Sequence, residues 1–341
     1  MRHVNIPIFI PHLGCPNQCV FCNQRTISGV ESFDPSTLRD TIEGAMSTIN
    51  EDDFVEIAFF GGSFTGIDRD LMVELLKIAN EYIIIGRVNS IRCSTRPDYI
   101  SEEILEILKK YGVKHIELGL QSCSDEVLFA TKRGHTRLQE VEACQLIKKH
   151  GFGLTGQMMI GLPKSTLERE INTAEFIISQ GCDSARIYPT VVFKNTELCD
   201  MAESGMYEPL STDDAIVRSA AVLEKFLEAG IDVIRIGLCA SENLSAEDTY
   251  YSGPNHSALG ELVINQVYYR KIYREASLMG LRADDHLVVC VSRASLSKAV
   301  GQKKRNKLLL EETLGIRHVK FMESDEVSGY DVLLYTEEGE N

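Results

Sequence analysis

The chain has 341 residues, of which 44 % are hydrophobic and 25 % charged, and its formal net charge is −15. This length allows one large domain with a substantial core and a smaller second domain, and the acidic charge excludes a surface that is basic throughout. No apolar run approaches the roughly 20 residues of a membrane span, and the N-terminus lacks the pattern of a signal peptide. We therefore expect a cytoplasmic protein with no membrane segment.

Short β-type runs alternate with amphipathic helical stretches along the first two thirds of the chain. The runs are predicted at 6–11, 55–62, 89–95, 114–120, 153–162 and 184–190, and DVIRIGL is a candidate seventh strand after a helix at 212–229. This alternation predicts a parallel βα array of six units. We expect an α/β fold of the partial (βα)6-type TIM-barrel class, with its chemistry at the C-terminal ends of the strands.

The pattern changes after residue 256. A predicted helix at 257–279 leads to a strand–helix–helix–strand unit at 287–322, so we expect domains at 1–256 and 257–341, the second a small α+β domain. Residues 266–322 carry twelve Lys and Arg against five Asp and Glu, which predicts a local basic patch. The acidic end TEEGEN is predicted to be frayed.

Three cysteines lie close together in the segment FIPHLGCPNQCVFCNQRTISG. Cys15, Cys19 and Cys22 follow the first predicted strand with the spacing C-x3-C-x2-C, so three thiolates can converge on one metal centre. Structural zinc prefers four protein ligands, whereas an iron–sulfur cluster held by three cysteines keeps one iron open for a small molecule. The alternatives are a zinc knuckle completed by His12, or structural thiols. The seven other cysteines are scattered singly, which is typical of buried reduced thiols.

This loop, with aromatic Phe21 before the third cysteine, resembles the signature of the radical SAM superfamily. The segments AFFGGSFTGI, STRPDYI, IELGLQSCSDEVLFATKRGHT, GQMMIGLPKST and RIYPTVVFKNTEL resemble, in order and spacing, the radical SAM half of the Elongator catalytic subunit. They are more distantly similar to oxygen-independent coproporphyrinogen dehydrogenase. The resemblance covers residues 5–265. It implies a 4Fe–4S cluster that cleaves S-adenosylmethionine (SAM) to a 5′-deoxyadenosyl radical, and an electron donor such as flavodoxin or ferredoxin.

The resemblance also implies roles for individual residues. The cysteines would be the cluster ligands, Phe21 would pack on adenine, and Gln121 and Arg133 would contact the ribose and the carboxylate of SAM. The methionine end would meet Gly61, Gly62 and the hydroxyl of Ser63. No catalytic residue is predicted beyond the cluster and this SAM site.

Each of these residues has a simpler interpretation. The glycine pair also fits a strand-end turn, and Gln121 and Arg133 also fit a barrel-rim hydrogen bond and a solvated helix charge. Two positions depart from the related enzymes, because Ser94 stands where a glutamate is frequent and Gln157 stands where the coproporphyrinogen enzyme has an aspartate. Both departures remove negative charge, so they suggest that the SAM contacts there are reorganised.

The segment SRASLSKAVGQKKRNKLLLEETLGI resembles a KH domain, in which a G-x-x-G loop clamps the backbone of single-stranded nucleic acid. The corresponding loop runs from Gly301 to Lys304 and lacks the second glycine. We expect the basic region 293–320 to contact tRNA or another RNA. The alternative is a KH-shaped domain that only braces the barrel.

Three functions are therefore open. The first is a radical SAM enzyme that modifies tRNA or another RNA, the second a radical SAM enzyme on a small metabolite such as a tetrapyrrole, and the third a metal-stabilised RNA-binding module without catalysis. The ordered set of glycine, glutamine and arginine positions argues against the third. Elongator-type enzymes carry an acetyltransferase domain after the radical half, and this chain has no room for one, so we expect that it does not complete the Elongator reaction alone.

Overall fold

The computed structural model describes residues 2–11, 13–15, 19–23, 32–238 and 249–337. Contacts divide the chain into two units, one of residues 1–211 with 225–255 and the other of residues 212–224 with 256–341. Among the described residues, no helix is both long enough and apolar enough to cross a membrane.

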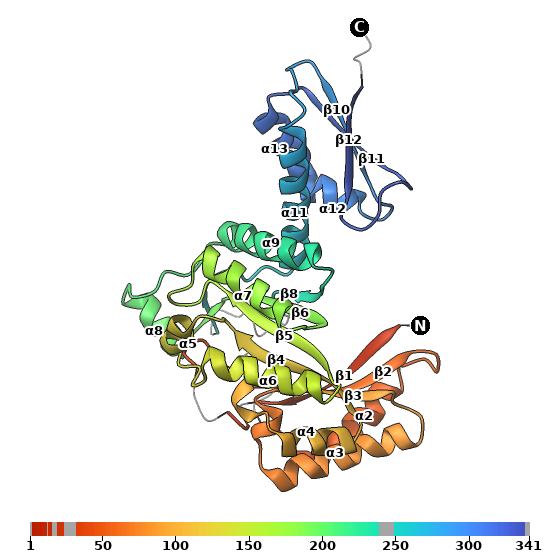
Figure 1. The fold of residues 1–341 in the computed structure, drawn as a ribbon, viewed down its shortest axis with the longest axis vertical. Helices are drawn as coiled ribbons and strands as arrows, with labels where there is room; N and C mark the ends of the chain where they lie inside the picture. Colours follow the sequence, from red (N-terminus) through yellow and green to blue (C-terminus); the bar gives the residue numbers. More distant parts are fainter. Residues whose placement is uncertain (1, 12, 16–18, 24–31, 239–248, 338–341) are drawn as a thin grey trace. The chain divides into compact units, whose positions relative to one another are not determined.

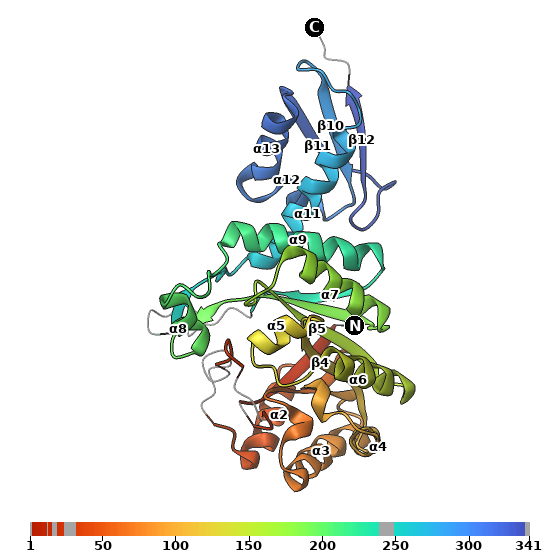
Figure 2. The ribbon, with the colours of Figure 1, turned by 60° about the vertical axis from the view of Figure 1, so that its left-hand side comes forward.

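The larger unit is built on a seven-stranded sheet in which all neighbouring strands are parallel. Figures 1 and 2 show that the sheet is curled, with helices on its outer side. The partial barrel predicted from the sequence is thus confirmed, and the candidate seventh strand is present beside β6. In sheet order the strands are β1 (His3–Ile10), β2 (Phe54–Gly61), β3 (Ser90–Thr95), β4 (Val113–Gln121), β5 (Gly153–Ile160), β6 (Ser184–Pro189) and β8 (Asp232–Ile236).

Helices connect successive strands, and polar caps fix where several of them begin. In the capping box of α6, the side chain of Thr136 accepts from the N–H of Gln139, and the Gln139 side chain accepts from the N–H of Thr136. Ser101 and Thr166 cap α4 and α7. The helices of this unit are α2 (Leu38–Met46), α3 (Arg69–Ile84), α4 (Glu102–Lys110), α5 (Asp125–Ala130), α6 (Arg137–Lys149), α7 (Leu167–Ser179) and α8 (Glu197–Glu203). The next helix along the chain is α9 (Thr212–Glu228), of which residues 212–224 belong to the smaller unit. Short 3-10 turns occupy Pro35–Thr37 (η1), Phe64–Gly66 (η2) and Pro97–Tyr99 (η3), and β7 (Val192–Phe193) pairs with β9 (Tyr250–Ser252).

The two faces of the sheet differ in polarity. A side chain at Gly156 of β5 would meet Ile177 of α7 at 2.7 Å, so this face packs on the helices, and its neighbour Leu118 is fully buried. Because side chains alternate along a strand, Glu117 lies on the opposite, inner face. Arg92 lies on the same inner face, two residues before Ser94, which is the register partner of Glu117. The lumen of the half-barrel therefore carries buried charges.

Six of the seven scattered cysteines, at positions 93, 123, 144, 182, 199 and 290, are buried and free, as predicted. Cys239 lies outside the described residues.

The smaller unit contains a three-stranded sheet with β10 (His286–Val291) in the centre. β10 is parallel to β11 (His318–Glu323) and antiparallel to β12 (Val332–Glu337). The chain between β10 and β11 forms α12 (Leu296–Val300), η4 (Gln302–Lys304) and α13 (Arg305–Leu314), and α11 (Leu259–Ala276) precedes them. The predicted strand–helix–helix–strand order is present. The prediction of a frayed end was wrong for Thr336 and Glu337, which belong to β12.

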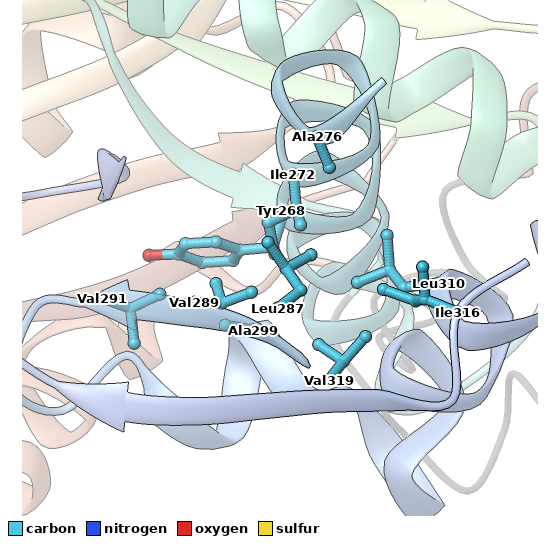
Figure 3. Close-up of a cluster of buried hydrophobic side chains, with 10 residues drawn as sticks. All are labelled: Tyr268, Ile272, Ala276, Leu287, Val289, Val291, Ala299, Leu310, Ile316 and Val319. Atoms are coloured by element: carbon cyan, nitrogen blue, oxygen red, sulfur yellow. The ribbon is translucent and has the colours of Figure 1, made fainter. Parts of the chain in front are cut away.

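The core of this unit joins α11 to the sheet and to α13. Tyr268 and Ile272 of α11 pack with Leu287 and Val289 of β10 and with Leu310 of α13, and all five are at most 1 % exposed (Figure 3). Burial of an aliphatic side chain of this kind contributes about 1.5–3 kcal/mol. The unit therefore has its own hydrophobic core.

Candidate metal and SAM site

The three clustered cysteines lie in the loop that follows β1. Cys19 is buried, and Cys15 and Cys22 are half-buried. The N–H of Val20 donates to the carbonyl of Thr131 at 3.2 Å, and Val20 in turn accepts from the N–H of Leu198 at 2.8 Å. The loop is thus attached to the segment after α5 and to the start of α8. Residues 16–18 and His12, the proposed fourth zinc ligand, lie outside the described residues.

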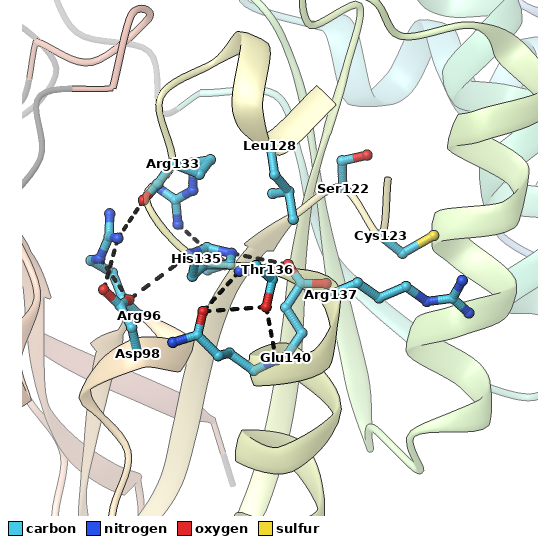
Figure 4. Close-up of polar contacts among 12 residues, drawn as sticks. Arg96, Asp98, Ser122, Cys123, Leu128, Arg133, His135, Thr136, Arg137 and Glu140 are labelled. Atoms are coloured by element: carbon cyan, nitrogen blue, oxygen red, sulfur yellow. Dashed lines mark hydrogen bonds and ion pairs between the residues drawn. The ribbon is translucent and has the colours of Figure 1, made fainter. Parts of the chain in front are cut away.

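Two buried guanidinium groups face Cys19. Nη1 of Arg133 lies 3.3 Å from its Sγ and Nη1 of Arg96 lies 3.9 Å from it, and both arginines are labelled in Figure 4. Arg133 is 6 % exposed and Arg96 is 4 % exposed, so the interpretation of Arg133 as a solvated helix charge is wrong. Burial raises the pKa of the nearby Cys15 thiol, and Arg96 and Arg133 oppose this rise. The surroundings therefore favour the neutral thiol at Cys15, although the two guanidinium groups stabilise negative charge there.

Gly61 and Gly62 bring the end of β2 into close contact with the end of β1. A Cβ at Gly62 would lie 2.0 Å from the carbonyl oxygen of Leu13, and one at Gly61, whose φ is 110°, would lie 2.8 Å from that of Ile10. The N–H of Gly62 donates to Ile10 at 2.8 Å. These glycines are thus required for the approach of the two loops, which fits the strand-end interpretation and leaves a contact with SAM as a prediction.

Ser63 is engaged inside the protein. It is fully buried, its hydroxyl lies 2.8 Å from Oγ1 of Thr95, and it accepts from the N–H of Arg96 at 3.3 Å. The hydroxyl predicted for the methionine end of SAM therefore holds the end of β3 and the backbone of Arg96.

Gln121 ends β4 in an unusual conformation. Its φ is 71°, which a residue with a side chain rarely adopts, and it follows a bulge against β5. Its Oε1 is buried without a hydrogen-bond partner among the described residues, so the described residues do not supply the expected rim hydrogen bond to this atom. Nε of Arg133 is likewise unpartnered there, although Nη2 of Arg133 donates to the carbonyl of Gly119 at 2.6 Å. A strained backbone and unpaired polar side-chain atoms at the same rim are typical of a site that binds a polar ligand.

The two departures from the related enzymes converge on Glu117, a residue that sequence reasoning missed. Nε2 of Gln157 donates to Oε2 of Glu117 at 2.9 Å, and Oγ of Ser94 donates to the same oxygen at 3.4 Å. Ser94 of β3 and Gln157 of β5 therefore share one carboxylate, that of Glu117 on β4.

Glu117 also holds two arginines of the lumen. Its Oε1 lies 2.8 Å from Nη2 of Arg186 and 3.2 Å from Nη1 of Arg92. Arg92 also contacts Glu56, with Nε at 3.3 Å from Oε2. These charges alternate with apolar residues along their strands, and this alternation is the sequence signal that would have revealed a polar lumen.

Phe21 lies at the edge of an apolar cluster formed by Val20, Val192 and Leu198 with neighbouring residues. It is half-buried, so part of its ring is accessible. Its contact with adenine stays a prediction.

Two family models match the chain, the radical SAM superfamily over residues 9–177 and the radical SAM C-terminal domain over 182–269. The chain belongs to the radical SAM superfamily, whose cofactors are a 4Fe–4S cluster and SAM. The second model extends past the expected domain boundary at 256.

Curated relatives include a putative methylthiotransferase of Methanocaldococcus jannaschii, 29 % identical over 57 % of this chain and 43 % of its own length. The tRNA uridine(34) acetyltransferase of the same organism is 33 % identical over 45 % of this chain and 29 % of its own length. Elongator complex protein 3 of Saccharomyces cerevisiae is 26 % identical over 62 % of this chain and 46 % of its own length. The chain thus spans less than half the length of these relatives. Among solved structures, Elp3 of Methanocaldococcus infernus shares the fold, with a TM-score of 0.60 and 23 % identity over 84 % of this chain and 70 % of that chain.

The chemistry of the described donors fits both cofactors of the superfamily, although among the described residues no three His, Cys, Asp or Glu side chains form a group that could hold a metal ion. Cys15, Cys19 and Cys22 would supply the thiolates, two cations lie beside Cys19, and a three-cysteine set leaves one position of a cluster open. The unpartnered oxygen of Gln121 and the unpartnered Nε of Arg133 offer an acceptor and a donor for SAM.

Proposed function

We propose that this chain holds a 4Fe–4S cluster through Cys15, Cys19 and Cys22 and cleaves SAM reductively. The observation that carries the proposal is the contact of Arg133 with Cys19, because it joins the cysteine loop to the rim where Gln121 has an unpaired oxygen. When bound, the cluster would supply the electron that breaks a carbon–sulfur bond of SAM and so starts hydrogen abstraction. A low-potential protein such as flavodoxin or ferredoxin would be the electron donor.

The chain's own residues would bind SAM and orient it. Arg133 places a cation where the carboxylate of SAM is expected, and Gln121 accepts a hydrogen bond through Oε1. The half-buried ring of Phe21 covers the adenine. Glu117, 1 % exposed, accepts a hydrogen bond from Gln157 and so fixes the side chain of Gln157 in the lumen.

The test is SAM cleavage by the reconstituted protein under anaerobic conditions. With dithionite and no substrate, slow release of 5′-deoxyadenosine is expected from the unchanged protein, and none from Cys19→Ala. Cys93→Ala is a matched control, because Cys93 is a fully buried cysteine outside the loop, and it should retain the activity. Equal release from the Cys19 variant, or none from the unchanged protein with its iron bound, would overturn the proposal.

We further propose that the substrate is tRNA or another RNA. One support is that a similar protein is named as a tRNA uridine(34) acetyltransferase. The second lies in the loop of the smaller unit, where Lys304 has φ 61° and ψ 26°, the left-handed conformation that glycine favours. Lys304 stands where a KH loop has its second glycine, so the loop has a glycine-like backbone without the glycine.

The ion pairs of this unit indicate which of its basic residues are available for contact with RNA. Most basic residues of 266–322 form ion pairs, with acidic partners at positions 213, 224, 284, 285, 311, 325, 331 and 337. Lys303 and Lys304 are exposed and form no ion pair among the described residues. Two unneutralised lysines in the predicted loop support a phosphate contact there. If replacement of Lys303 and Lys304 abolishes RNA binding, the result favours RNA as the substrate. An unchanged affinity for RNA favours a small metabolite as the substrate.

A further inference from the structure

Arg96 occupies a central place behind the cysteine loop. It follows β3, and its Nη1 lies 3.9 Å from Sγ of Cys19. Its Nη2 donates to the backbone carbonyl of Arg133, and its own N–H is held by Ser63. One side chain thus contacts a cysteine of the loop and the backbone of the arginine that contacts the same cysteine.

Asp98 fixes the orientation of this guanidinium. Its two oxygens lie 2.9 Å from Nε and 3.0 Å from Nη2 of Arg96, a paired arrangement that restricts both position and plane (Figure 4). Burial acts to lower the pKa of Arg96, but Asp98 together with Cys19 and Cys15 outweighs it, and the pKa is raised. Arg133 is the third charge here, and Nδ1 of His135 lies 3.9 Å from Oδ1 of Asp98.

We propose that Arg96 is a positioning residue for Cys19, and that the Arg96–Asp98 pair sets the reduction potential of the centre bound there. This inference rests on the proposed function, because it requires a redox centre at the cysteines. The step is the uptake of one electron from a low-potential flavin or iron–sulfur donor, and it forms and breaks no bond. The added negative charge is stabilised by Arg96 and Arg133 and is opposed by Asp98.

These charges interact strongly with the centre because they are buried. Cys19 is 6 % exposed and Arg96 4 % exposed, so water screens them little. Hydrogen bonds to cluster sulfurs and nearby charge are among the factors that set the potential of such centres. Arg96 is the member of the pair that contacts Cys19, and at Cys15 its charge acts more strongly than the opposing charge of Asp98, so the cation dominates. Removing Arg96 therefore makes reduction harder, and neutralising Asp98 makes it easier.

The test is a redox titration of the reconstituted protein at one pH, followed by electron paramagnetic resonance. Arg96→Gln should lower the reduced fraction at a fixed potential roughly tenfold, which is about 59 mV for one electron. Asp98→Asn should raise the potential, and Arg96→Lys should restore most of the shift. Arg39→Gln breaks an exposed ion pair with Glu81 at 2.7 Å and should change nothing.

Opposite shifts for the two variants support the inference, because a purely structural role would lower the iron content of both and would give no opposed signs. Shifts of the same sign, or none with iron retained, would overturn it. If the Arg96→Gln variant loses its iron, the reduction potential of the Asp98→Asn variant alone tests the inference, since that variant keeps the Arg96 cation. Failure of the unchanged protein to bind iron contradicts the proposed function and is read from the iron content before any titration.

Discussion

Arg133 donates through Nη1 to Sγ of Cys19 at 3.3 Å, although the two residues are 114 positions apart in the chain. The same guanidinium donates to the carbonyl of Gly119 at 2.6 Å. A single side chain therefore links the cysteine loop to the rim of β4, and its substitution should separate the binding of SAM from the binding of iron.

Arg133→Gln should weaken SAM binding by tenfold or more and leave the iron content near that of the unchanged protein. The reason is that a charge-assisted hydrogen bond to the SAM carboxylate, worth about 1.5–3 kcal/mol, is lost, whereas the cysteines themselves bind iron. Isothermal titration with SAM and an iron assay measure the two effects. Loss of iron together with SAM binding would show that Arg133 acts on the loop and not on the ligand.

Glu117 should be required for the stability of the half-barrel. Glu117→Gln leaves Arg92 and Arg186 without the carboxylate that both contact, and breaking a buried pair of this kind costs about 3–5 kcal/mol. Urea unfolding measures this loss. Glu102→Gln is the matched control, because Glu102 forms a largely exposed pair with Lys149 and should change the free energy of unfolding by less than about 1 kcal/mol. Equal effects of the two substitutions would contradict the role given to the lumen charges.

His135 and Glu140 form a fully buried pair with 3.0 Å between Nε2 and Oε1. Burial raises the pKa of Glu140 well above its usual value, with Asp125 adding to the rise and Arg133 and Arg137 opposing it. Burial, Arg133 and Arg96 lower the pKa of His135 to about 3. His135 is thus neutral near pH 7, and the raised pKa of Glu140 favours its protonated form, which can donate to the imidazole.

The signs of the two contributions to stability differ. The contribution of Glu140 is fully present below its unfolded pKa of 4.5 and is lost as the pH rises. The contribution of His135 is present above pH 6.5 and is lost as the pH falls toward 3. Glu140→Gln keeps a hydrogen-bond donor for His135 and removes only the pH dependence of stability that arises from Glu140.

Glu140→Gln should therefore be more stable than the unchanged protein at pH 8, by about 1 kcal/mol or more, and equal to it at pH 4. Thermal unfolding at a series of pH values should show the gain as roughly 2–4 °C per kcal/mol. A variant that is less stable at both pH values would mean that Glu140 is ionised and paired with a charged His135.

The loop of the smaller unit gives a prediction for RNA. Lys303→Glu with Lys304→Glu should weaken RNA binding and lower the slope of log affinity against log salt by about 1.4, at roughly 0.7 per contact for a single strand. Arg317→Glu is the control, because Arg317 already pairs with Asp284 at 3.3 Å. SAM cleavage should survive in both. A salt series that the double substitution leaves unchanged would favour the small-metabolite function.

Much of the fold could be predicted because its signals are local. The alternation of strands and helices, the seventh strand at 232–236 and the spacing of the three cysteines are all visible within short windows of the sequence. The last strand, VLLYTE, was not predicted although it begins with the apolar run VLLY; it runs directly into the acidic end of the chain, and its residues are mostly exposed.

The partners of the site residues could not be predicted, since they depend on strand register. Ser94 and Gln157 were identified as departures, but their common partner Glu117 is 23 and 40 positions away. Arg96 and Asp98 lie within the quoted segment STRPDYI, yet nothing in that segment indicates that Arg96 reaches a cysteine 77 positions earlier. Long-range contacts of this kind require the folded chain.

The most direct test of a cluster at the cysteine loop is the metal content of anaerobically purified and reconstituted protein. We expect a brown protein with about four irons per chain, and a colourless Cys19→Ala variant with little iron. A colourless unchanged protein that contains one zinc per chain would contradict the presence of a cluster, because it would identify the cysteine loop as a structural zinc site.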